Sequence, residues 1–395
     1  MSLHIKLPNP QGQISAYKLV GRVPVKPVAG GKFNRIAYSA AHVVSNPFAA
    51  IDPWLDSAVD WDATISYRLH LWSLGMGVAE AMDTAQRGMG LDWPTSLELI
   101  RRSIDAAKDK PGAFLASGCG TDHLNIEAVK TVDEVIAGYE FQMEAIEKLG
   151  GKLILMASRA LARVATSPAD YERVYDRILR QAKQPVVLHW LGDMFDPALS
   201  GYWGDKNIDA AMNTALSIIQ AHADKVDGIK ISLLDKDKEI QMRRRLPKGV
   251  RMYTGDDFNY AELIAGDGFG EHLVQGQSDA LLGIFDAIAP AASAALGELA
   301  KGNLEKFHAI LEPTVPLSRH IFQAPTRFYK TGVVFMAWLN GHQKHFTMVG
   351  GQESSRSLVH LAELFRLADA ANLLEQPDLA LHRMKTFLAM HGVEN

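Results

Sequence analysis

The sequence predicts a closed (β/α)8 barrel, an α/β fold, with a helical appendage at its C-terminal end. Apolar segments of strand length alternate eight times with amphipathic stretches of helix length, which is typical of βα units around a parallel sheet. Near residue 291 the strand pattern stops, and only helical patterns follow. The 395 residues can bury one large core, and eight such units at this length close most economically into a barrel.

A doubly wound open sheet is the alternative fold, because it is built from the same βα units. That fold commonly binds phosphate through a glycine-rich turn after its first strand. No such turn follows the first predicted strand, residues 35–43. We therefore favour the barrel.

The barrel strands are expected at eight short apolar segments. They are residues 35–43, 77–83, 112–118, 152–157, 185–191, 227–232, 251–255 and 271–275. Helical stretches lie between them. The stretch 131–149 opens with a capping box formed by Thr131 and Glu134, and the stretch 167–183 opens with Ser167 as a cap and Pro168 at the first helical position.

Three regions divide the chain. Residues 1–33, rich in Pro, Gly and Val, form an N-terminal extension that has room for a short strand or two, residues 34–300 form the barrel, and residues 301–395 form the helical region. Around the end of the barrel and beyond it, helices are expected at 292–300, 304–311, 332–340, 354–371 and 378–391. This block is too long for one closing helix, so we expect it to pack on the barrel or on a second subunit.

The composition argues against a membrane protein and against a nucleic-acid-binding protein. Hydrophobic residues make up 47% of the chain, and no apolar run approaches the roughly 20 residues of a spanning helix. No signal-peptide pattern opens the sequence. The 41 Lys and Arg against 45 Asp and Glu give a net charge of −4 without a basic stripe, so no nucleic-acid partner is expected. Cys119, the single cysteine, cannot form an internal disulfide, which fits a cytoplasmic protein.

Lys230 is the most informative residue, because it places one amine in the apolar segment 226–232. Burial disfavours the ammonium form, so a buried lysine tends towards the neutral, nucleophilic amine that forms Schiff bases with carbonyls. The alternative is a lysine at a strand end that extends to solvent or pairs with Asp227 or Asp235. Gly228 and Ser232 share the face of Lys230 by period-two alternation, and these small residues leave room for a covalently bound substrate.

Active sites of such barrels lie at the C-terminal ends of the strands. Polar or small residues stand at these ends along the whole predicted barrel. They are His42, Asn46, Asp83, Thr84, Ser117, Thr121, Asp122, His123, Ser158, Arg159, His189, Trp190, Asp193, Lys230, Ser232, Gly255, Asp256, Asp257, Gln275 and Gln277. His189 lies one strand before Lys230, so its imidazole is a candidate proton shuttle, although a lone histidine in an apolar strand is also a common core residue.

Several short motifs follow one another in a definite order. A Gly-Ile-Lys motif ends at Lys230, Gly255-Asp256-Asp257 follows on the next strand, and Gly268-Phe-Gly270 comes next. This order resembles the dihydrodipicolinate synthase and N-acetylneuraminate lyase family. Asn46-Pro47-Phe48 is similar to the Thr-Pro-Phe of that family. The resemblance covers roughly residues 34–290 and extends in kind to the helical tail. It implies that Lys230 forms an imine with a substrate carbonyl, that no metal or organic cofactor is needed, and that the chain forms a homo-oligomer, a dimer or tetramer.

The chain departs from this family at three strand ends. Met82-Asp83-Thr84-Ala85-Gln86 replaces the Gly-Thr-Thr-Gly-Glu that holds the carboxylate of a 2-oxo acid. Thr84 can keep part of that role, whereas Asp83 would repel a carboxylate if it faced the site. His189-Trp190 replaces a Tyr-Asn pair, and Met156-Ala157-Ser158-Arg159 replaces Pro-Pro-Tyr-Tyr. A divergent member that uses its lysine on a different substrate is therefore expected.

We therefore predict a Schiff-base-forming lyase of the aldolase type, acting on a small-molecule carbonyl compound, a 2-oxo acid or a keto-sugar or sugar acid. Lys230 and His189 are the predicted catalytic residues. The predicted substrate-binding residues are Asp83, Thr84, Trp190, Ser232, Gly255, Asp256, Asp257 and Gln275. Two alternatives remain: a metal-dependent sugar isomerase or epimerase, because Asp and His residues stand at several strand ends, and a barrel that binds a ligand without catalysis. The segment 322–348 of the tail, with Arg327, Tyr329, Lys330 and His345, is considered for contact with substrate or with a neighbouring subunit.

Overall fold

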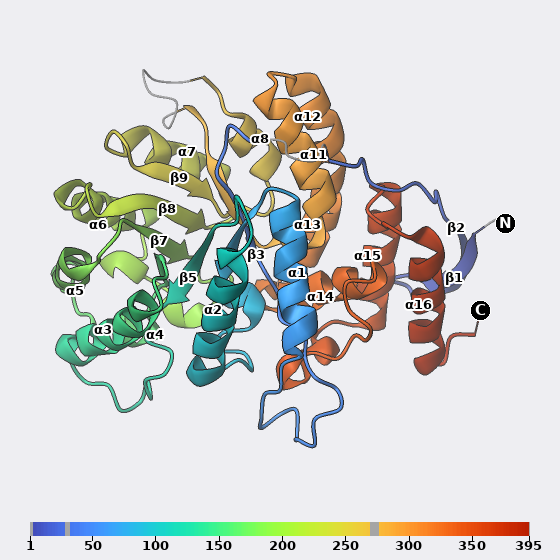
Figure 1. Cartoon of the computed structure of the whole chain (residues 1–395), viewed down its shortest axis with the longest axis horizontal. Coiled ribbons are helices and arrows are strands. Elements are labelled where there is room, and N and C mark those ends of the chain that lie inside the picture. The colour runs from blue at the N-terminus through green and yellow to red at the C-terminus, as the bar shows by residue number, and fades with distance from the viewer. Residues whose placement is uncertain (1–2, 28–31, 269–275, 395) are drawn as a thin grey trace.

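A computed structural model describes residues 3–27, 32–268 and 276–394. Its centre is a closed barrel of eight parallel strands, so the predicted fold is confirmed (Figure 1). The strands are β3 (Ala37–Ala40), β4 (Gly77–Glu80), β5 (Leu115–Cys119), β6 (Leu153–Leu155), β7 (Val186–Leu191), β8 (Val226–Ser232), β9 (Arg251–Thr254) and β10 (Asp279–Leu282). Each strand pairs with its neighbours along the chain, and β10 pairs with β3 to close the ring.

The eighth strand differs from the prediction. The segment 271–275 lies outside the described residues, and the strand that closes the barrel is β10, which pairs with β3 and β9. This strand is only four residues long and buried on both faces, and the polar run Gln275-Gly276-Gln277-Ser278 precedes it. An apolar segment of only four residues is a weak indication of a strand in a sequence.

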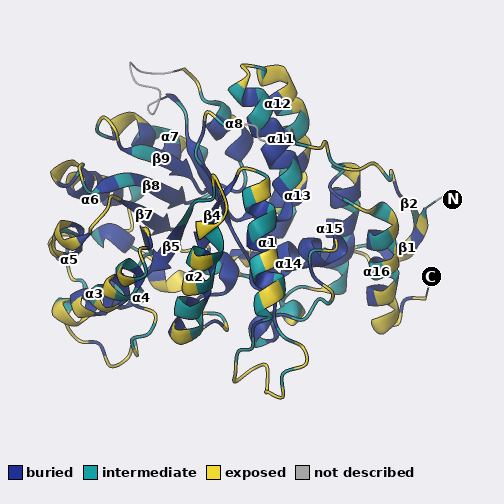
Figure 2. Cartoon of the chain, viewed as in Figure 1, coloured by how far each residue is buried: buried dark blue, intermediate teal, exposed yellow. Residues whose placement is uncertain are grey.

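Helices surround the barrel and follow its strands. They are α1 (Trp61–Ser73), α2 (Trp93–Lys108), α3 (Val132–Lys148), α4 (Arg159–Val164), α5 (Pro168–Gln181), α6 (Ile208–Ala221), α7 (Lys236–Arg245), α8 (Tyr260–Ala265), α10 (Ile284–Ala287) and α11 (Ala289–Ala300). The predicted capping box is present, because Thr131 accepts from the backbone of Glu134 and the Glu134 carboxylate accepts from that of Thr131. Outward helix faces are exposed, whereas the strands are buried (Figure 2).

The C-terminal helices pack beside the barrel. They are α12 (Leu304–Leu311), α13 (Val315–Ile321), α14 (Tyr329–Leu339), α15 (Leu358–Ala370) and α16 (Pro377–Met390). Every residue of α14 is buried (Figure 2), because this helix lies between the barrel and the rest of the tail.

The N-terminal extension reaches the far side of the tail. Its antiparallel strands β1 (His4–Pro8) and β2 (Ile14–Lys18) lie beside α15 and α16 (Figure 1). The Asp369 carboxylate accepts hydrogen bonds from the Tyr17 hydroxyl at 2.7 Å and from the backbone of Val20 and Gly21. The two ends of the sequence are therefore joined through the helical tail. Among the described residues, no helix is long and apolar enough to cross a membrane.

Candidate active site

Lys230 projects into the barrel interior from β8. The interior is filled by an apolar cluster to which the other strands contribute residues such as Val187 of β7 and Tyr253 of β9. Register pairs Val187 with Gly228 and His189 with Lys230, so period two turns His189 and Lys230 to the same inner side. Lys230 is only 7% exposed. Lys230 is therefore not a lysine at a strand end that extends to solvent.

Gly255 makes room for the lysine. A Cβ placed at Gly255 would lie 2.7 Å from Lys230 Cε, 2.4 Å from Ser232 Oγ and 2.6 Å from the Ile231 carbonyl oxygen. The lysine stem therefore passes directly over the backbone at the end of β9. Only glycine leaves this space open, because every other residue carries a Cβ.

Charges near Lys230 adjust its protonation. Burial lowers the pKa of Lys230, and the carboxylates of Asp257 and Asp83 partly offset this effect. Burial raises the pKa of Asp257 to about 7, against the opposing effects of a hydrogen bond from Ile284 N at 2.9 Å and of the nearby Lys230 amine. Burial therefore disfavours the charged form of both groups, and each group partly offsets this effect on the other.

His189 stands beside this pair. Its Nε2 lies 3.4 Å from Ser232 Oγ on the adjacent strand. Burial, with a smaller effect from Lys230, lowers the pKa of His189 well below the ordinary value. The ring is therefore neutral at physiological pH, in contrast to the expectation from sequence that it titrates near neutrality.

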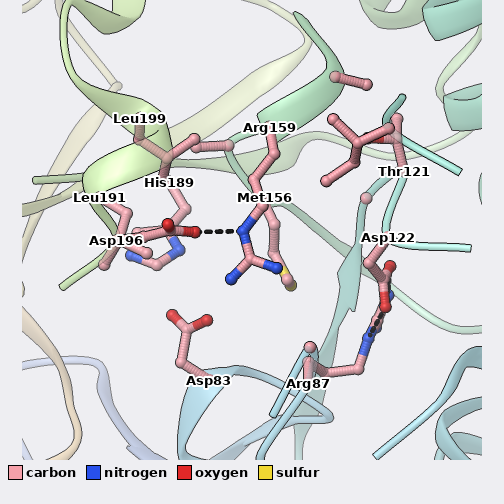
Figure 3. Close-up of a pocket in the computed structure, with 15 residues that line it drawn as sticks. Asp83, Arg87, Thr121, Asp122, Met156, Arg159, His189, Leu191, Asp196 and Leu199 are labelled. Atoms are coloured by element: carbon pink, nitrogen blue, oxygen red, sulfur yellow. Dashed lines mark hydrogen bonds and ion pairs between the residues drawn. The ribbon is translucent and has the colours of Figure 1, made fainter. Parts of the chain in front are cut away.

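A cavity with an empty volume of about 590 Å³ opens at the C-terminal ends of β4 to β7. His189 and Asp83 line it (Figure 3). Arg159 donates from Nε to Asp196, and its terminal nitrogens face the carboxylate of Asp83 across the cavity (Figure 3). Cationic, anionic and imidazole groups thus surround one space.

Arg87, also at this cavity, is committed to the framework. It pairs with Asp122 and also donates to Gln142 and to the carbonyl oxygens of Ala81 and Gly118. These bonds fasten the turn after β4 to β5 and α3. The β4 strand itself ends at Glu80, earlier than predicted, and Asp83 and Thr84 lie on the 3-10 turn η1 (Asp83–Ala85).

The helical tail completes the site. The Tyr329 hydroxyl lies 2.8 Å from Thr84 Oγ1, and its ring stacks on Phe322 at 4.3 Å. Burial raises the pKa of Tyr329, with further effects from Asp83 and Asp257, the two carboxylates that also act on Lys230. Burial lowers the pKa of the next residue, Lys330, to about 8. Sequence analysis noted both residues but did not assign them to the site, because distance along the chain conceals this contact.

Two described residues of the predicted site lie elsewhere. Trp190 points outward, because it alternates with His189, and packs on Trp203 at 6.2 Å. Asp256 turns away from Lys230 and accepts hydrogen bonds from Asn259 Nδ2 and from the backbone of Phe258 and Asn259, so it holds its own loop. Gln275 lies outside the described residues. The predictions of substrate contacts for Trp190 and Asp256 are corrected accordingly.

Solved structures with the same fold are dihydrodipicolinate synthases and their relatives. One from Aquifex aeolicus is 11% identical, covers 86% of this chain and 99% of its own, and has a TM-score of 0.62. A prophage protein of that family from E. coli K12, solved with pyruvate, is 14% identical over 91% and 99%, with a TM-score of 0.61. The enzyme from Cyanidioschyzon merolae is 16% identical over 87% and 100%, with a TM-score of 0.63.

These likenesses confirm the predicted resemblance at the level of the fold. The sequence has diverged far from theirs, and no curated protein matches it. One family model, described as a protein of unknown function (DUF993), matches residues 5–393. The chain therefore belongs to the DUF993 family and has the same fold as the dihydrodipicolinate synthases.

Proposed function

We propose that this protein is a Schiff-base-forming lyase in which Lys230 attacks the carbonyl carbon of its substrate. The observation that supports this most is the buried Lys230 amine with its lowered pKa, beside Asp257 and His189 at the end of the barrel where such folds hold their active sites. A buried charge without a function is costly, since burial disfavours the ammonium form.

The first stage is formation of the imine. The lone pair of Lys230 Nζ forms a bond to the carbonyl carbon as the carbon–oxygen π bond breaks, the carbonyl oxygen takes up a proton, and the nitrogen gives one up. The resulting carbinolamine loses this oxygen as water after a second protonation. Asp257, with its pKa raised to about 7, supplies and recovers these protons near neutral pH.

The second stage uses the protonated imine to accept electrons. In a cleavage, the bond from the carbon next to the imine to the following carbon breaks, its electron pair stays in an enamine, and the hydroxyl on the departing carbon gives up its proton as that carbon becomes a carbonyl. In a dehydration, the carbon next to the imine loses a proton to form the enamine, and the hydroxyl on the following carbon then takes up a proton and leaves as water. The neutral His189 imidazole is the proposed proton carrier at this stage, and the pair of hydroxyls on Tyr329 and Thr84 carries protons both here and during formation of the imine. Ser232 orients the imidazole.

The substrate class follows from the groups around the cavity. Arg159 lines the cavity, and Lys330 lies close enough to feel the charges of three cavity residues, Asp83, Arg159 and Asp196. With a pKa lowered to about 8, Lys330 still carries its charge at pH 7, so both side chains are cationic partners for an acid group. The carboxylates of Asp83 and Asp196 accept hydrogen bonds from hydroxyls. We propose a 2-oxo acid with further hydroxyl groups, such as a keto-sugar acid.

The alternative of a metal-dependent isomerase has less support. Among the described residues, the one group of three side chains with metal-binding geometry is His70, His342 and Glu375, and none of these lines the cavity. A metal mechanism would also leave the buried Lys230 without a role. A barrel that only binds a ligand remains an outcome of the test below.

The test is reductive trapping with borohydride in the presence of pyruvate, and of keto-sugar acids, followed by intact mass and peptide mapping. We expect an adduct on Lys230, lost in Lys230→Ala. Lys225→Ala is the matched control, because Lys225 stands before the other end of the same strand and donates to the Ala182 carbonyl. An adduct on Lys330 in place of Lys230, or trapping unchanged by Lys230→Ala, would contradict the mechanism.

We also propose, by resemblance, a cytoplasmic homo-oligomer. Sedimentation at several protein concentrations measures the assembly, and a mass of 43.3 kDa at all of them would show a monomer instead.

Burial raises the pKa of the single thiol, Cys119, which makes it an unreactive packing residue.

A further inference from the structure

Three side chains from separate elements meet at the seam between the barrel and the helical tail. His70 lies in the last turn of α1, His342 follows α14, and Glu375 lies between α15 and α16. One ligand atom from each residue lies within 4.8 Å of those of the other two. The two imidazole rings are 4.5 Å apart, and His342 Nε2 is 2.8 Å from Glu375 Oε1.

The Asn340 side chain links the two tail segments that carry His342 and Glu375. Asn340 ends α14 and is buried. Its Oδ1 accepts from the backbone of Glu375 at 3.0 Å, and its Nδ2 donates to the Leu373 carbonyl at 3.0 Å. Asn340 therefore fastens the loop that carries Glu375 to the turn that carries His342. The two ligands are positioned before any ion arrives.

The third residue has a nitrogen that the protein does not satisfy. His70 Nε2 is buried and has no hydrogen-bond partner among the described residues. A buried polar atom without a partner is rare in folded proteins and calls for an explanation. A bound cation would supply the missing partner.

We propose that His70, His342 and Glu375 bind a divalent transition-metal ion, Zn²⁺ by preference. Two imidazole nitrogens and one carboxylate oxygen are a known zinc ligand set, with the fourth position left to water. Ligands about 2 Å from a tetrahedral ion lie roughly 3.3 Å from each other. Small side-chain rotations reach this geometry, with the ion in place of the proton shared by His342 and Glu375.

The ion acts as a clamp rather than as part of the proposed reaction. It joins α1 of the barrel to two loops of the tail. Tyr67 lies next to it, because its ring contacts both histidines. The Tyr67 hydroxyl donates to the Asp286 carbonyl at 2.6 Å. Since the tail also carries Tyr329, the clamp secures the element that completes the candidate active site.

The experiment measures zinc binding by the untagged, full-length protein after treatment with EDTA. We expect one equivalent of zinc by calorimetry and by elemental analysis, and a melting temperature that rises with zinc concentration. Co²⁺ should give visible absorption bands of a four-coordinate site. His70→Gln and Glu375→Gln should each weaken zinc binding by more than about tenfold.

His308→Gln is the matched control, because His308 pairs with Glu312 at 2.8 Å in the same tail but has no second histidine beside it. Its zinc affinity should equal that of the unmodified protein. Melting without zinc reports whether each variant folds, and Glu375→Gln retains the shape of the site should His70→Gln be unstable. Absence of saturable zinc binding, or affinity retained in both cluster variants, would overturn the proposal.

Discussion

At the scale of single residues, the candidate site depends on how tightly Lys230 is enclosed. Its carbon chain fills the space above Gly255, and its amine and the Asp257 carboxylate influence each other's pKa. A poorly solvated amine tends towards the neutral, nucleophilic form that imine chemistry requires.

Gly255→Ala tests the enclosure. The added methyl group would lie 2.6 Å from the Ile231 carbonyl oxygen, which cannot move freely, and 2.7 Å from Lys230 Cε. We expect a loss of about 1 to 3 kcal/mol in the free energy of unfolding and a strong decrease in the rate of trapping at Lys230. Urea unfolding and borohydride trapping measure the two effects.

Gly297→Ala is the control for that substitution. Gly297 lies within α11, and a Cβ there would meet no atom within 4 Å. Replacing this glycine should stabilise the protein by about 0.5 to 1 kcal/mol, because alanine favours the helix. If Gly255→Ala and Gly297→Ala had the same effects on stability and on trapping, the close packing of Lys230 over Gly255 would contribute to neither.

At the scale of elements, α14 brings the tail into the barrel mouth. All its residues are buried, and its first residue, Tyr329, meets Thr84 of the turn after β4. The helix was predicted at 332–340 from its apolar run, three residues later than its observed start at Tyr329. Helix ends are poorly marked when no polar cap precedes them, as at Phe328 here.

Tyr329→Phe tests this element. The ring and its stacking on Phe322 remain, whereas the hydrogen bond to Thr84 is lost. We expect imine formation to slow by about 10² or more and the free energy of unfolding to fall by only about 1 kcal/mol. Tyr38→Phe, in the interior apolar cluster, is the control. Equal trapping rates in all three proteins would remove Tyr329 from the mechanism.

At the scale of the whole molecule, buried acids tie stability to pH. The pKa of Asp257 is raised to about 7 in the folded protein, from an ordinary value of 3.8. Between these values the folded state holds a proton that the unfolded state has released. The free energy of unfolding therefore falls as the pH rises from about 4 to about 7, and this contribution is constant above that range.

Asp257→Asn should remove this contribution. We expect the variant to lose less stability than the unmodified protein between pH 5 and pH 7, by up to a few kcal/mol, when both are unfolded with urea. The exposed Asp224→Asn is the control. A slope equal to that of the unmodified protein would mean that the Asp257 carboxyl is ionised throughout this range.

The sequence by itself determined the barrel, because strands buried on both faces must be apolar throughout and helices between them must be amphipathic. It also placed Gly228 and Ser232 on the face of Lys230, since strand alternation is a local property. The same alternation places His189 and Trp190 on opposite faces, but only the structure decided that His189 points into the barrel and Trp190 away from it. The closing strand β10 escaped prediction because its signal is four residues long.

Only the tertiary structure decided which distant groups surround the amine and how they ionise. Tyr329 and Thr84 lie 245 residues apart and still share a hydrogen bond. The raised pKa of Asp257 and the lowered pKa of His189 arise from burial, which depends on packing by the whole chain. The cluster of His70, His342 and Glu375 likewise brings together residues from three elements, and no regular spacing along the sequence connects them. The periodicity of the sequence encodes the type of each element and the side to which its side chains point. The proximity of distant side chains and the desolvation of their charges exist only after the chain has folded.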